Sequence, residues 1–274
     1  MSDVMKKLNE TVSFINAQIN AKATVGVILG SGLGNFIDEV VIEKEINYKD
    51  IPHFPVSTVK GHSGKLILGS INGKKIWIMS GRFHFYEGYT PQQVTYPIRV
   101  LKLLGVEKLL LSNAAGSVNP NYEVGDLIII KDHVSFFSAN PLIGPNVEEL
   151  GPRFPDMSEA YSKDIIKLAK SIAEKHQIKV QEGVYVAVTG PTFETRAEYQ
   201  LIKVIGGDVV GMSTAQENII AVHCGIKVFA MSVVTDIGIR EDDNVITHEE
   251  VLIAAKGAEP KFSLLFRELA EALS

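Results

Sequence analysis

The sequence predicts an α/β protein with a mixed β-sheet, and three features indicate this. Short apolar runs rich in β-branched residues alternate with longer segments of helical periodicity, as strands and helices do in α/β folds. An Asn72-Gly73 pair joins two of the apolar runs and favours an antiparallel hairpin. The composition does not shift along the 274 residues, of which 46% are hydrophobic, so we expect one domain over residues 1–274.

The predicted strands are short and separated by turns or helices. The first covers residues 23–29 and ends in the glycine-rich loop Gly30-Ser31-Gly32-Leu33-Gly34. Residues 65–71 and 74–79 form the predicted hairpin. Further strands are expected at residues 108–112, 126–130, 183–188, 208–211 and 227–234.

Helices are predicted between the strands and near both ends of the chain. They are expected at residues 4–19, 92–104, 158–176, 195–205 and 215–223. Asp156 and Glu159 have capping-box spacing at the start of the third of these. Thr247-His248-Glu249-Glu250 is a second capping box and predicts a last helix. We expect Pro260 to interrupt that helix, because proline lacks the N–H donor that a helix interior needs.

Charge and composition exclude several classes of function. The net charge is −5 with no block of like charge, so we expect no nucleic-acid partner, although a local anion site remains possible. Cys224 is the single cysteine, so no intrachain disulfide can form, which fits a reducing compartment. The N-terminal residues lack the apolar core of a secretory signal, and no apolar run approaches the roughly 18 residues of a membrane span. We therefore expect a cytoplasmic protein that has no membrane segment.

Polar residues gather where the predicted strands end, which is where ligands bind in α/β folds. The five segments are residues 30–32, 80–84, 112–116, 189–194 and 211–214. The glycine-rich loop could direct backbone N–H groups at an anion, or it could be an ordinary tight turn. It is not a dinucleotide fingerprint, whose third glycine would fall at Asn35, and no Gly-Lys-Ser/Thr of a P-loop follows it.

Several side chains in these segments suit an anion. Arg82 and His84 are two residues apart, so on an extended segment they face the same way, and a guanidinium group suits phosphate oxygens. Ser213 precedes a predicted helix, whose N-terminus attracts anions. Each residue also has an ordinary interpretation, as a solvated arginine, a histidine with a structural partner or a helix-capping serine. His62, between two glycines and a serine, is equally ambiguous.

Phe193 and Glu194 have the chemistry of a site for a flat heterocyclic base. An aromatic ring can stack on such a base, while a carboxylate accepts hydrogen bonds from its N–H groups. The alternative is a solvated acid in a loop. We find no H-E-x-x-H, C-x-x-C or paired-carboxylate pattern, so we expect no metal site.

Seven segments, in this order, closely resemble the trimeric purine nucleoside phosphorylases. They are residues 30–34, 60–64, 81–89, 112–116, 190–195, 210–214 and 247–251, and the likeness covers nearly the whole chain. The resemblance implies cleavage of purine nucleosides by inorganic phosphate to free base and ribose 1-phosphate. It also implies a single α/β domain whose central sheet curls into a partial barrel, a homotrimer, and no cofactor besides the phosphate co-substrate.

The resemblance implies roles for individual residues. Phosphate would be bound by Ser31, Arg82, His84, Ser213 and the backbone of Ala114, with His62 at the same end of the site. Tyr86 and Met212 would contact the ribose, His248 its 5′-hydroxyl, and Phe193 and Glu194 the purine. Asn113 would shape the loop at its strand end, and Phe154 would close the sugar pocket of the neighbouring subunit. The catalytic candidates are His84, Glu194 and Asp236.

Asp236 departs from the family pattern and bears on which base is preferred. Members specific for 6-oxopurines have Thr-Asn where this chain has Thr235-Asp236, and the related methylthioadenosine phosphorylases have Asp. Glu194 matches the N1–H of hypoxanthine and guanine, which adenine lacks, whereas an ionised Asp236 would accept from the 6-amino group of adenine. A protonated Asp236, favoured by burial beside other acids, could instead donate to N7. We therefore expect inosine, guanosine and their 2′-deoxy forms to be preferred over adenosine.

Two other classes of protein remain as alternatives. Residues 211–215 differ by one residue from the G-x-S-x-G elbow of serine hydrolases, and Asp236 and His248 follow Ser213 in Ser–Asp–His order. Labelling of Ser213 by a serine-directed fluorophosphonate would favour that class. The second alternative is a nucleoside-binding protein without activity, which would bind inosine or guanosine in phosphate without turnover.

Overall fold

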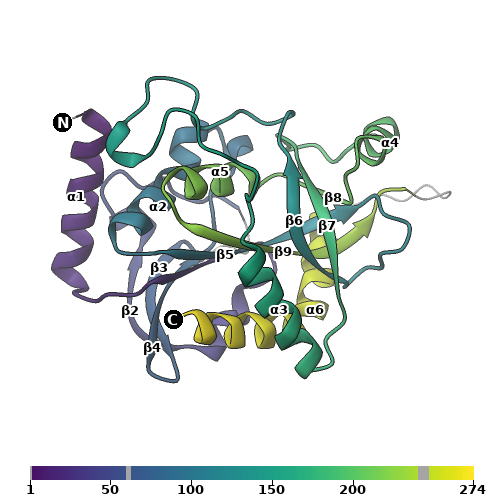
Figure 1. The fold of residues 1–274 in the computed structure, drawn as a ribbon, viewed down its shortest axis with the longest axis horizontal. Coiled ribbons are helices and arrows are strands. Elements are labelled where there is room, and N and C mark those ends of the chain that lie inside the picture. The colour runs from purple at the N-terminus through teal and green to yellow at the C-terminus, as the bar shows by residue number, and fades with distance from the viewer. Residues whose placement is uncertain (1, 60–62, 240–246) are drawn as a thin grey trace.

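The computed structural model describes residues 2–59, 63–239 and 247–274, which form a mixed sheet flanked by helices (Figure 1). The strands are β1 Val25–Leu29, β2 Val41–Asn47, β3 Lys65–Ile71, β4 Lys74–Ser80, β5 Lys108–Ser117, β6 Leu127–Val134, β7 Val180–Ala187, β8 Val209–Gly211 and β9 Lys227–Ile237. The α-helices are α1 Asp3–Gln18, α2 Pro91–Leu103, α3 Lys163–Lys175, α4 Arg196–Val204, α5 Ala215–His223 and α6 His248–Leu273. Short 3-10 helices are η1 Gly34–Glu39, η2 Tyr48–Asp50, η3 Phe85–Glu87 and η4 Glu148–Leu150.

Part of the sheet closes on itself. The strand order is β2-β3-β4-β1-β5-β8-β7-β6-β9, and a further pairing between β5 and β9 joins β5, β8, β7, β6 and β9 into a ring. Strand β1 lies parallel to both β4 and β5, and β5 is parallel to β9, whereas β6 is antiparallel to β9. These pairings confirm the predicted mixed sheet and its curling into a barrel.

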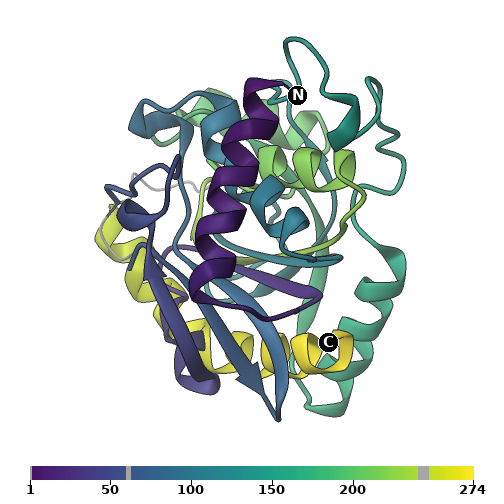
Figure 2. The ribbon, with the colours of Figure 1, turned by 90° about the vertical axis from the view of Figure 1, so that its left-hand side faces the viewer.

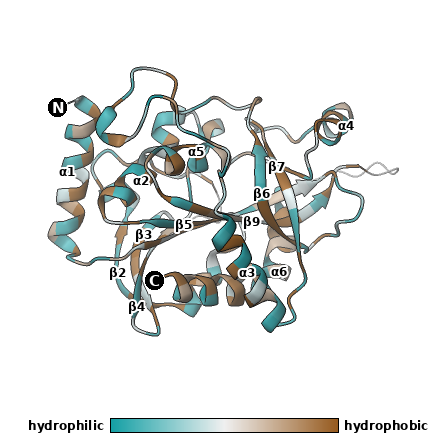
Figure 3. Ribbon diagram, in the orientation of Figure 1, coloured by the Kyte–Doolittle hydropathy of each residue, from teal (hydrophilic) through white to brown (hydrophobic). Residues whose placement is uncertain are grey.

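The sheet separates two apolar cores. Successive side chains of a strand point to opposite faces, and in β5 Leu109 and Leu111 enter the core beneath α1, α2 and α5, while Leu110 enters the core beneath α3 and α6. Figures 1 and 2 show these helices on either side of the sheet. In Figure 3, α1 alternates between hydrophilic and hydrophobic residues, as expected of a helix that buries one face.

The predicted hairpin and most of the predicted elements are confirmed. Asn72 and Gly73 both have positive φ, 49° and 81°, as a type I′ turn between β3 and β4 requires. Strand β2 was not predicted, because it lies at the sheet edge with only Ile46 buried and therefore has no apolar run. Strands β5 and β9 extend past their predicted ends at residues 112 and 234. The polar segment 112–116, expected to be a loop, is instead paired with β9 in the barrel wall.

Two predictions about helix boundaries are wrong. Helix α6 runs without interruption from His248 to Leu273 with Pro260 inside it. An interior proline costs about 3 kcal/mol, and the burial of residues such as Phe262 and Phe266 on this helix offsets that cost. Helix α3 begins at Lys163, because the Asp156 carboxylate forms a turn by accepting hydrogen bonds from the backbone N and hydroxyl of Ser158.

Within the described ranges, none of the helices is both long enough and apolar enough to cross a bilayer.

Candidate functional site

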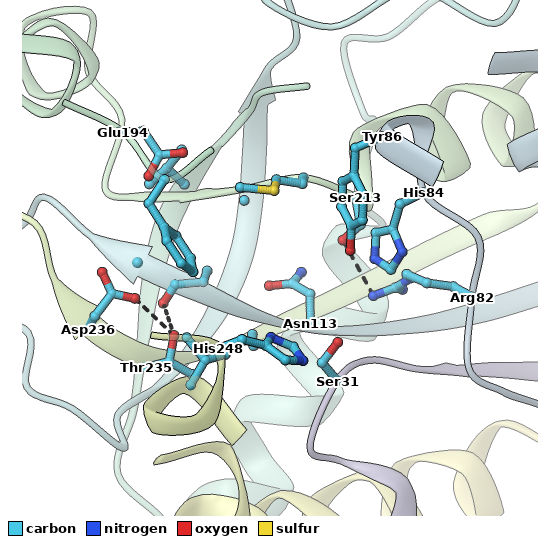
Figure 4. Close-up of a pocket in the computed structure, with 18 residues that line it drawn as sticks. Ser31, Arg82, His84, Tyr86, Asn113, Glu194, Ser213, Thr235, Asp236 and His248 are labelled. Carbon is cyan, nitrogen blue, oxygen red and sulfur yellow. Dashed lines mark hydrogen bonds between the residues drawn. The ribbon is translucent and has the colours of Figure 1, made fainter. Parts of the chain in front are cut away.

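A cleft opens where strands β1, β4, β5 and β9 end (Figure 4). The lining residues are Ser31, Arg82, His84, Tyr86, Asn113, Ala114, Ala115, Gly116, Phe193, Glu194, Val210, Gly211, Met212, Ser213, Thr235, Asp236, His248 and Val251. The structure therefore brings together every predicted site residue that it describes, except Phe154.

The cleft has two ends of opposite chemistry. Arg82, His84 and Ser213 lie together at one end, which we call the basic end (Figure 4). Glu194 and Asp236 lie together at the other, which we call the acidic end. A ligand that spans the cleft therefore meets a guanidinium group, an imidazole and a hydroxyl group on one side and carboxyl groups on the other.

Arg82 is held by a buried ion pair. Its side chain is 2% exposed, and Nε donates to Oε1 of Glu217 at 3.0 Å. Nη1 donates to the backbone oxygen of Ser112 and, at 3.4 Å, to Oγ of Ser213. Because guanidinium groups bind through a rigid planar fork, these contacts fix how the cation faces the cleft.

Glu217 is a residue that the sequence analysis missed. It lies on α5 and is 4% exposed, so its charge needs the Arg82 partner to be tolerated in the interior. A signal was present in the sequence, since Glu217 is the only acid in an otherwise neutral predicted helix, residues 215–223. Its pairing with an arginine more than a hundred residues away could not be inferred from that signal.

Glu87 orients the imidazole of His84. Oε1 of Glu87 accepts from the backbone N of His84 at 2.8 Å and contacts Nδ1 at 3.1 Å. Burial opposes ionisation of Glu87, but hydrogen bonds from His84 and Thr58 outweigh it and lower the pKa of Glu87 to about 2. A carboxylate at Nδ1 makes that nitrogen the donor and fixes the ring orientation. The ring of Tyr86 stacks on the other side, with centroids 4.7 Å apart.

Ser213 is presented to the cleft by a strained turn. Thr214 has φ 63° and ψ −54°, and the backbone N of Ala215 donates to the oxygen of Ser213 at 2.7 Å, which together define a classical γ-turn. Positive φ in a β-branched residue costs about 1–3 kcal/mol. Asn113 offsets this strain, because its Nδ2 donates to Oγ1 of Thr214 at 2.9 Å. The hydroxyl of Tyr185 accepts from the backbone N of Ser213 at 3.1 Å.

A β-bulge places Asp236 at the acidic end. The register between β5 and β9 shifts so that Ala115 faces Val234 but Gly116 faces Asp236, which leaves Thr235 as the extra residue. Thr235 and Asp236 consequently both line the cleft, and Oγ1 of Thr235 donates to Oδ1 of Asp236 at 3.1 Å. A Cβ at Gly116 would lie 2.8 Å from Oδ2 of Asp236, so a side chain there would displace the Asp236 carboxyl group.

Glu194 and Asp236 influence each other electrostatically. Burial raises the pKa of Glu194, and the negative charge of Asp236 raises it further. Burial likewise raises the pKa of the Tyr199 hydroxyl, and the charges of Asp236 and Glu194 add to that effect. The acidic end therefore contains groups that hold protons more tightly than they would in water.

One predicted site residue lies away from the cleft, and another is not among the residues that the structure describes. His62 falls outside the described residues. Phe154 lies away from the cleft and is 87% exposed, and the guanidinium carbon of Arg153 lies 5.6 Å from the centroid of its ring. Phe154 borders a second, apolar groove that also includes Phe136 and Ile143, which are 91% and 71% exposed.

Across the described residues, no group of three or more His, Cys, Asp or Glu side chains has the arrangement of a metal site.

The chain is similar to known enzymes over nearly its whole length. The model of the phosphorylase superfamily matches residues 24–271. Purine nucleoside phosphorylase 1 of Geobacillus stearothermophilus is 50% identical over 245 residues, which are 89% of each chain. Isoform 2 of purine nucleoside phosphorylase from Schistosoma mansoni, solved with cytosine and ribose-1-phosphate, is 44% identical with a TM-score of 0.92, covering 98% of this chain and 97% of that one. A Schistosoma purine nucleoside phosphorylase solved with guanosine is 41% identical with a TM-score of 0.90, covering 98% of both chains.

Proposed function

The chain belongs to the purine nucleoside phosphorylase family, and from this membership we propose how its cleft divides the substrates and which nucleosides it prefers. The reaction is the phosphorolysis of purine nucleosides to free base and pentose 1-phosphate. The observation that supports the proposal best is the polarity of the cleft, with the Arg82 cation and the His84 imidazole at one end and carboxyl groups at the other. An anionic co-substrate and a base with N–H donors match these ends.

Phosphate binds at the basic end. Arg82 and His84 supply charge-assisted donors, and the hydroxyls of Ser31 and Ser213 and the backbone of Ala114 complete the set. His62 is proposed at the same end on the family resemblance alone. Because Glu217 and Glu87 already hold Arg82 and His84, little reorganisation is needed when phosphate enters.

The nucleoside occupies the rest of the cleft. Tyr86 and Met212 contact the ribose, His248 binds its 5′-hydroxyl, and Phe193 stacks on the purine. Burial raises the pKa of Tyr86 to about 12, and the charge of Glu87 adds to this, so its hydroxyl remains a hydrogen-bond donor at neutral pH. Asn113 acts indirectly, through the turn that carries Ser213.

Bond cleavage depends on charge at both ends of the cleft. As the bond between C1′ and N9 breaks, the ribosyl group becomes cationic and the phosphate below C1′ stabilises it. The departing purine gains negative charge and needs a donor at N7, which a protonated Asp236 supplies. The side chains suffice for this chemistry, so we propose that the enzyme needs no metal or other cofactor.

Inosine and guanosine are the proposed substrates, together with their 2′-deoxy forms. An ionised Glu194 accepts from N1–H of either base, and from the 2-amino group of guanine. Adenosine has no N1–H to offer. Schistosoma relatives have been solved with guanosine, with hypoxanthine and with adenosine, so the proposed preference rests on Glu194.

The first test concerns Asp236. Replacement by asparagine should flatten the fall in inosine kcat/KM at alkaline pH, because an amide N–H remains a donor where a carboxyl group ionises and repels N7. Inosine cleavage itself should persist. The measurement is kcat/KM for inosine from neutral to alkaline pH in both forms of the enzyme. An identical alkaline limb in the two would rule out Asp236 as the proton donor.

The second test concerns a homotrimer with shared sites. The exposed Phe154 and its apolar neighbours form a surface that a second subunit can cover, and cyclic symmetry would bring Phe154 to the cleft of the neighbour. Phe154→Ala should raise the nucleoside KM by about 10-fold, the loss expected for one buried aromatic contact, with little change in the phosphate KM. Sedimentation should show a trimer for the wild type. A monomer with unchanged activity would contradict both statements.

We further propose that residues 1–274 form one domain and that the protein acts in the cytoplasm in purine salvage.

The serine hydrolase alternative is disfavoured by the partners of Ser213. Its Oγ contacts Arg82 at 3.4 Å and Oγ1 of Thr214 at 3.1 Å, which are partners suited to an anion-binding hydroxyl rather than to a serine activated by histidine.

A further inference from the structure

A buried carboxylate on the C-terminal helix α6 forms two hydrogen bonds to the loop that contains Ser31. We call this pair of hydrogen bonds the clasp. Glu259 lies on α6 and is 5% exposed. Its Oε1 accepts from the backbone N of Asn35 at 2.7 Å, and its Oε2 accepts from Nδ2 of the same residue at 2.7 Å. Two short bonds from one partner fix both position and orientation of the carboxylate.

The clasp meets a need of the short helix η1. Residues at the start of a helix have N–H groups without partners inside it, and Leu33, at the capping position of η1, has a side chain that cannot accept a hydrogen bond. Glu259, which is distant in the sequence, accepts the hydrogen bond from the backbone N of Asn35 instead.

The same loop is packed against α6 at two more places. Gly32 has φ 76°, and a Cβ there would lie 2.6 Å from Cβ of Ala255. Phe36 of η1 packs edge-on against Phe266, with ring centroids 6.4 Å apart. Contacts along three turns of α6 therefore determine where the loop lies.

The other side of the loop lies against β5. The backbone N of Gly30 donates to Oγ of Ser112 at 3.0 Å, and a Cβ at Gly30 would lie 2.7 Å from the backbone oxygen of Ser112. The oxygen of Ser112 also accepts from Arg82. Ser31 is consequently held between the strand that contacts Arg82 and the helix that carries His248 and Val251 into the cleft.

We propose that Glu259 is a positioning residue that holds Ser31 in place for phosphate and joins the phosphate site to the helix bordering the nucleoside site. This inference rests on the proposed role of Ser31 in binding phosphate. Glu259 itself does not line the cleft, so its effect passes through the loop. Small displacements of a binding group from its productive position are costly, up to about 100-fold for 1 Å.

The test compares Glu259→Ala with Glu259→Gln, and Glu271→Ala near the end of the same helix is the matched control. Glu259→Ala should raise the phosphate KM roughly 10-fold and reduce the increase in melting temperature that inorganic phosphate produces. The nucleoside KM should change less. Glu259→Gln keeps an acceptor for the backbone N of Asn35, and its amide N–H can donate to Oδ1 of Asn35 once the Asn35 amide turns over. Both hydrogen bonds are then retained, so this variant should behave nearly as the wild type, as should Glu271→Ala.

Two further variants separate the possible outcomes. Asn35→Ala changes an exposed residue and removes one of the two bonds, so it should fold and raise the phosphate KM by a smaller factor. Ser31→Ala tests the proposed phosphate ligand directly. A phosphate KM unchanged in Glu259→Ala and Asn35→Ala, but raised in Ser31→Ala, would overturn the inference about the clasp alone. A phosphate KM unchanged in Ser31→Ala would overturn the proposed role of Ser31 and the inference with it.

Discussion

Replacing Arg82 with alanine should raise the phosphate KM by about 100-fold, because a charge-assisted contact in a water-poor site is lost. The nucleoside KM should change much less, since Arg82 lies at the basic end of the cleft. Initial rates of base release from inosine, measured over a range of phosphate concentrations, give both constants. Phosphate should also protect the variant poorly against thermal unfolding.

The Arg82→Ala result needs a control for stability. Removing the guanidinium leaves Glu217 as a buried charge without its ion-pair partner, and breaking such a pair costs about 3–5 kcal/mol. The double variant Arg82→Ala with Glu217→Gln removes that charge and should regain stability without regaining phosphate affinity. A folded Arg82→Ala enzyme with a phosphate KM close to that of the wild type would contradict the assignment of the basic end.

Replacing Glu194 with alanine should lower kcat/KM for inosine and guanosine by about 100-fold, because the N1–H of the base loses its buried acceptor. Adenosine has no N1–H, so its kcat/KM should change little. Glu194→Gln supplies a sharper comparison. The amide keeps an acceptor for N1–H but places an N–H group where guanine presents its 2-amino group, so guanosine should lose more than inosine.

The raised pKa of Glu194 also predicts how inosine kcat/KM falls at acidic pH. Burial raises the pKa of Glu194, so its carboxyl group stays protonated to a higher pH than that of an ordinary glutamic acid. The accepting form is therefore lost on acidification at a pH above the usual range, and inosine kcat/KM should fall there. Equal losses for inosine and adenosine in Glu194→Ala would show that this residue does not select the base.

The sequence placed most of the cleft, because the chemistry of α/β folds concentrates at strand ends. Arg82 and Asn113 follow the predicted strands 74–79 and 108–112, which lie parallel to β1, so their ends meet at one edge of the sheet. Ser213 follows β8, which reaches the same cleft by antiparallel pairing with the end of β5. The segment around Asn113 was nevertheless expected to be a loop. It remains a strand because pairing with β9 satisfies its backbone, and the hydrophobic pattern carries no information on such polar pairing.

Contacts between side chains that are far apart in the chain could not be predicted from the sequence. Arg82 is paired with Glu217, and Asn35 is paired with Glu259. Both glutamates lie on helices, and the periodicity of a helix predicts which residues are buried but not which side chains they contact. The bulge at Thr235, which turns Asp236 into the cleft, depends on the register of two strands far apart in the chain. Pro260 was expected to interrupt the last helix, because proline has a low helix propensity. The helix continues through it, since burial of the apolar face of α6 outweighs that propensity.

The most direct test of the central claim is release of hypoxanthine from inosine with and without inorganic phosphate, in buffer containing EDTA. Since phosphate is the nucleophile that replaces the base at C1′, the rate should collapse when phosphate is omitted and saturate as it is restored, and ribose 1-phosphate should form in equal amount to the base. EDTA should have no effect. Equal rates of release without phosphate, with free ribose as the product, would make the protein a hydrolase and contradict the account.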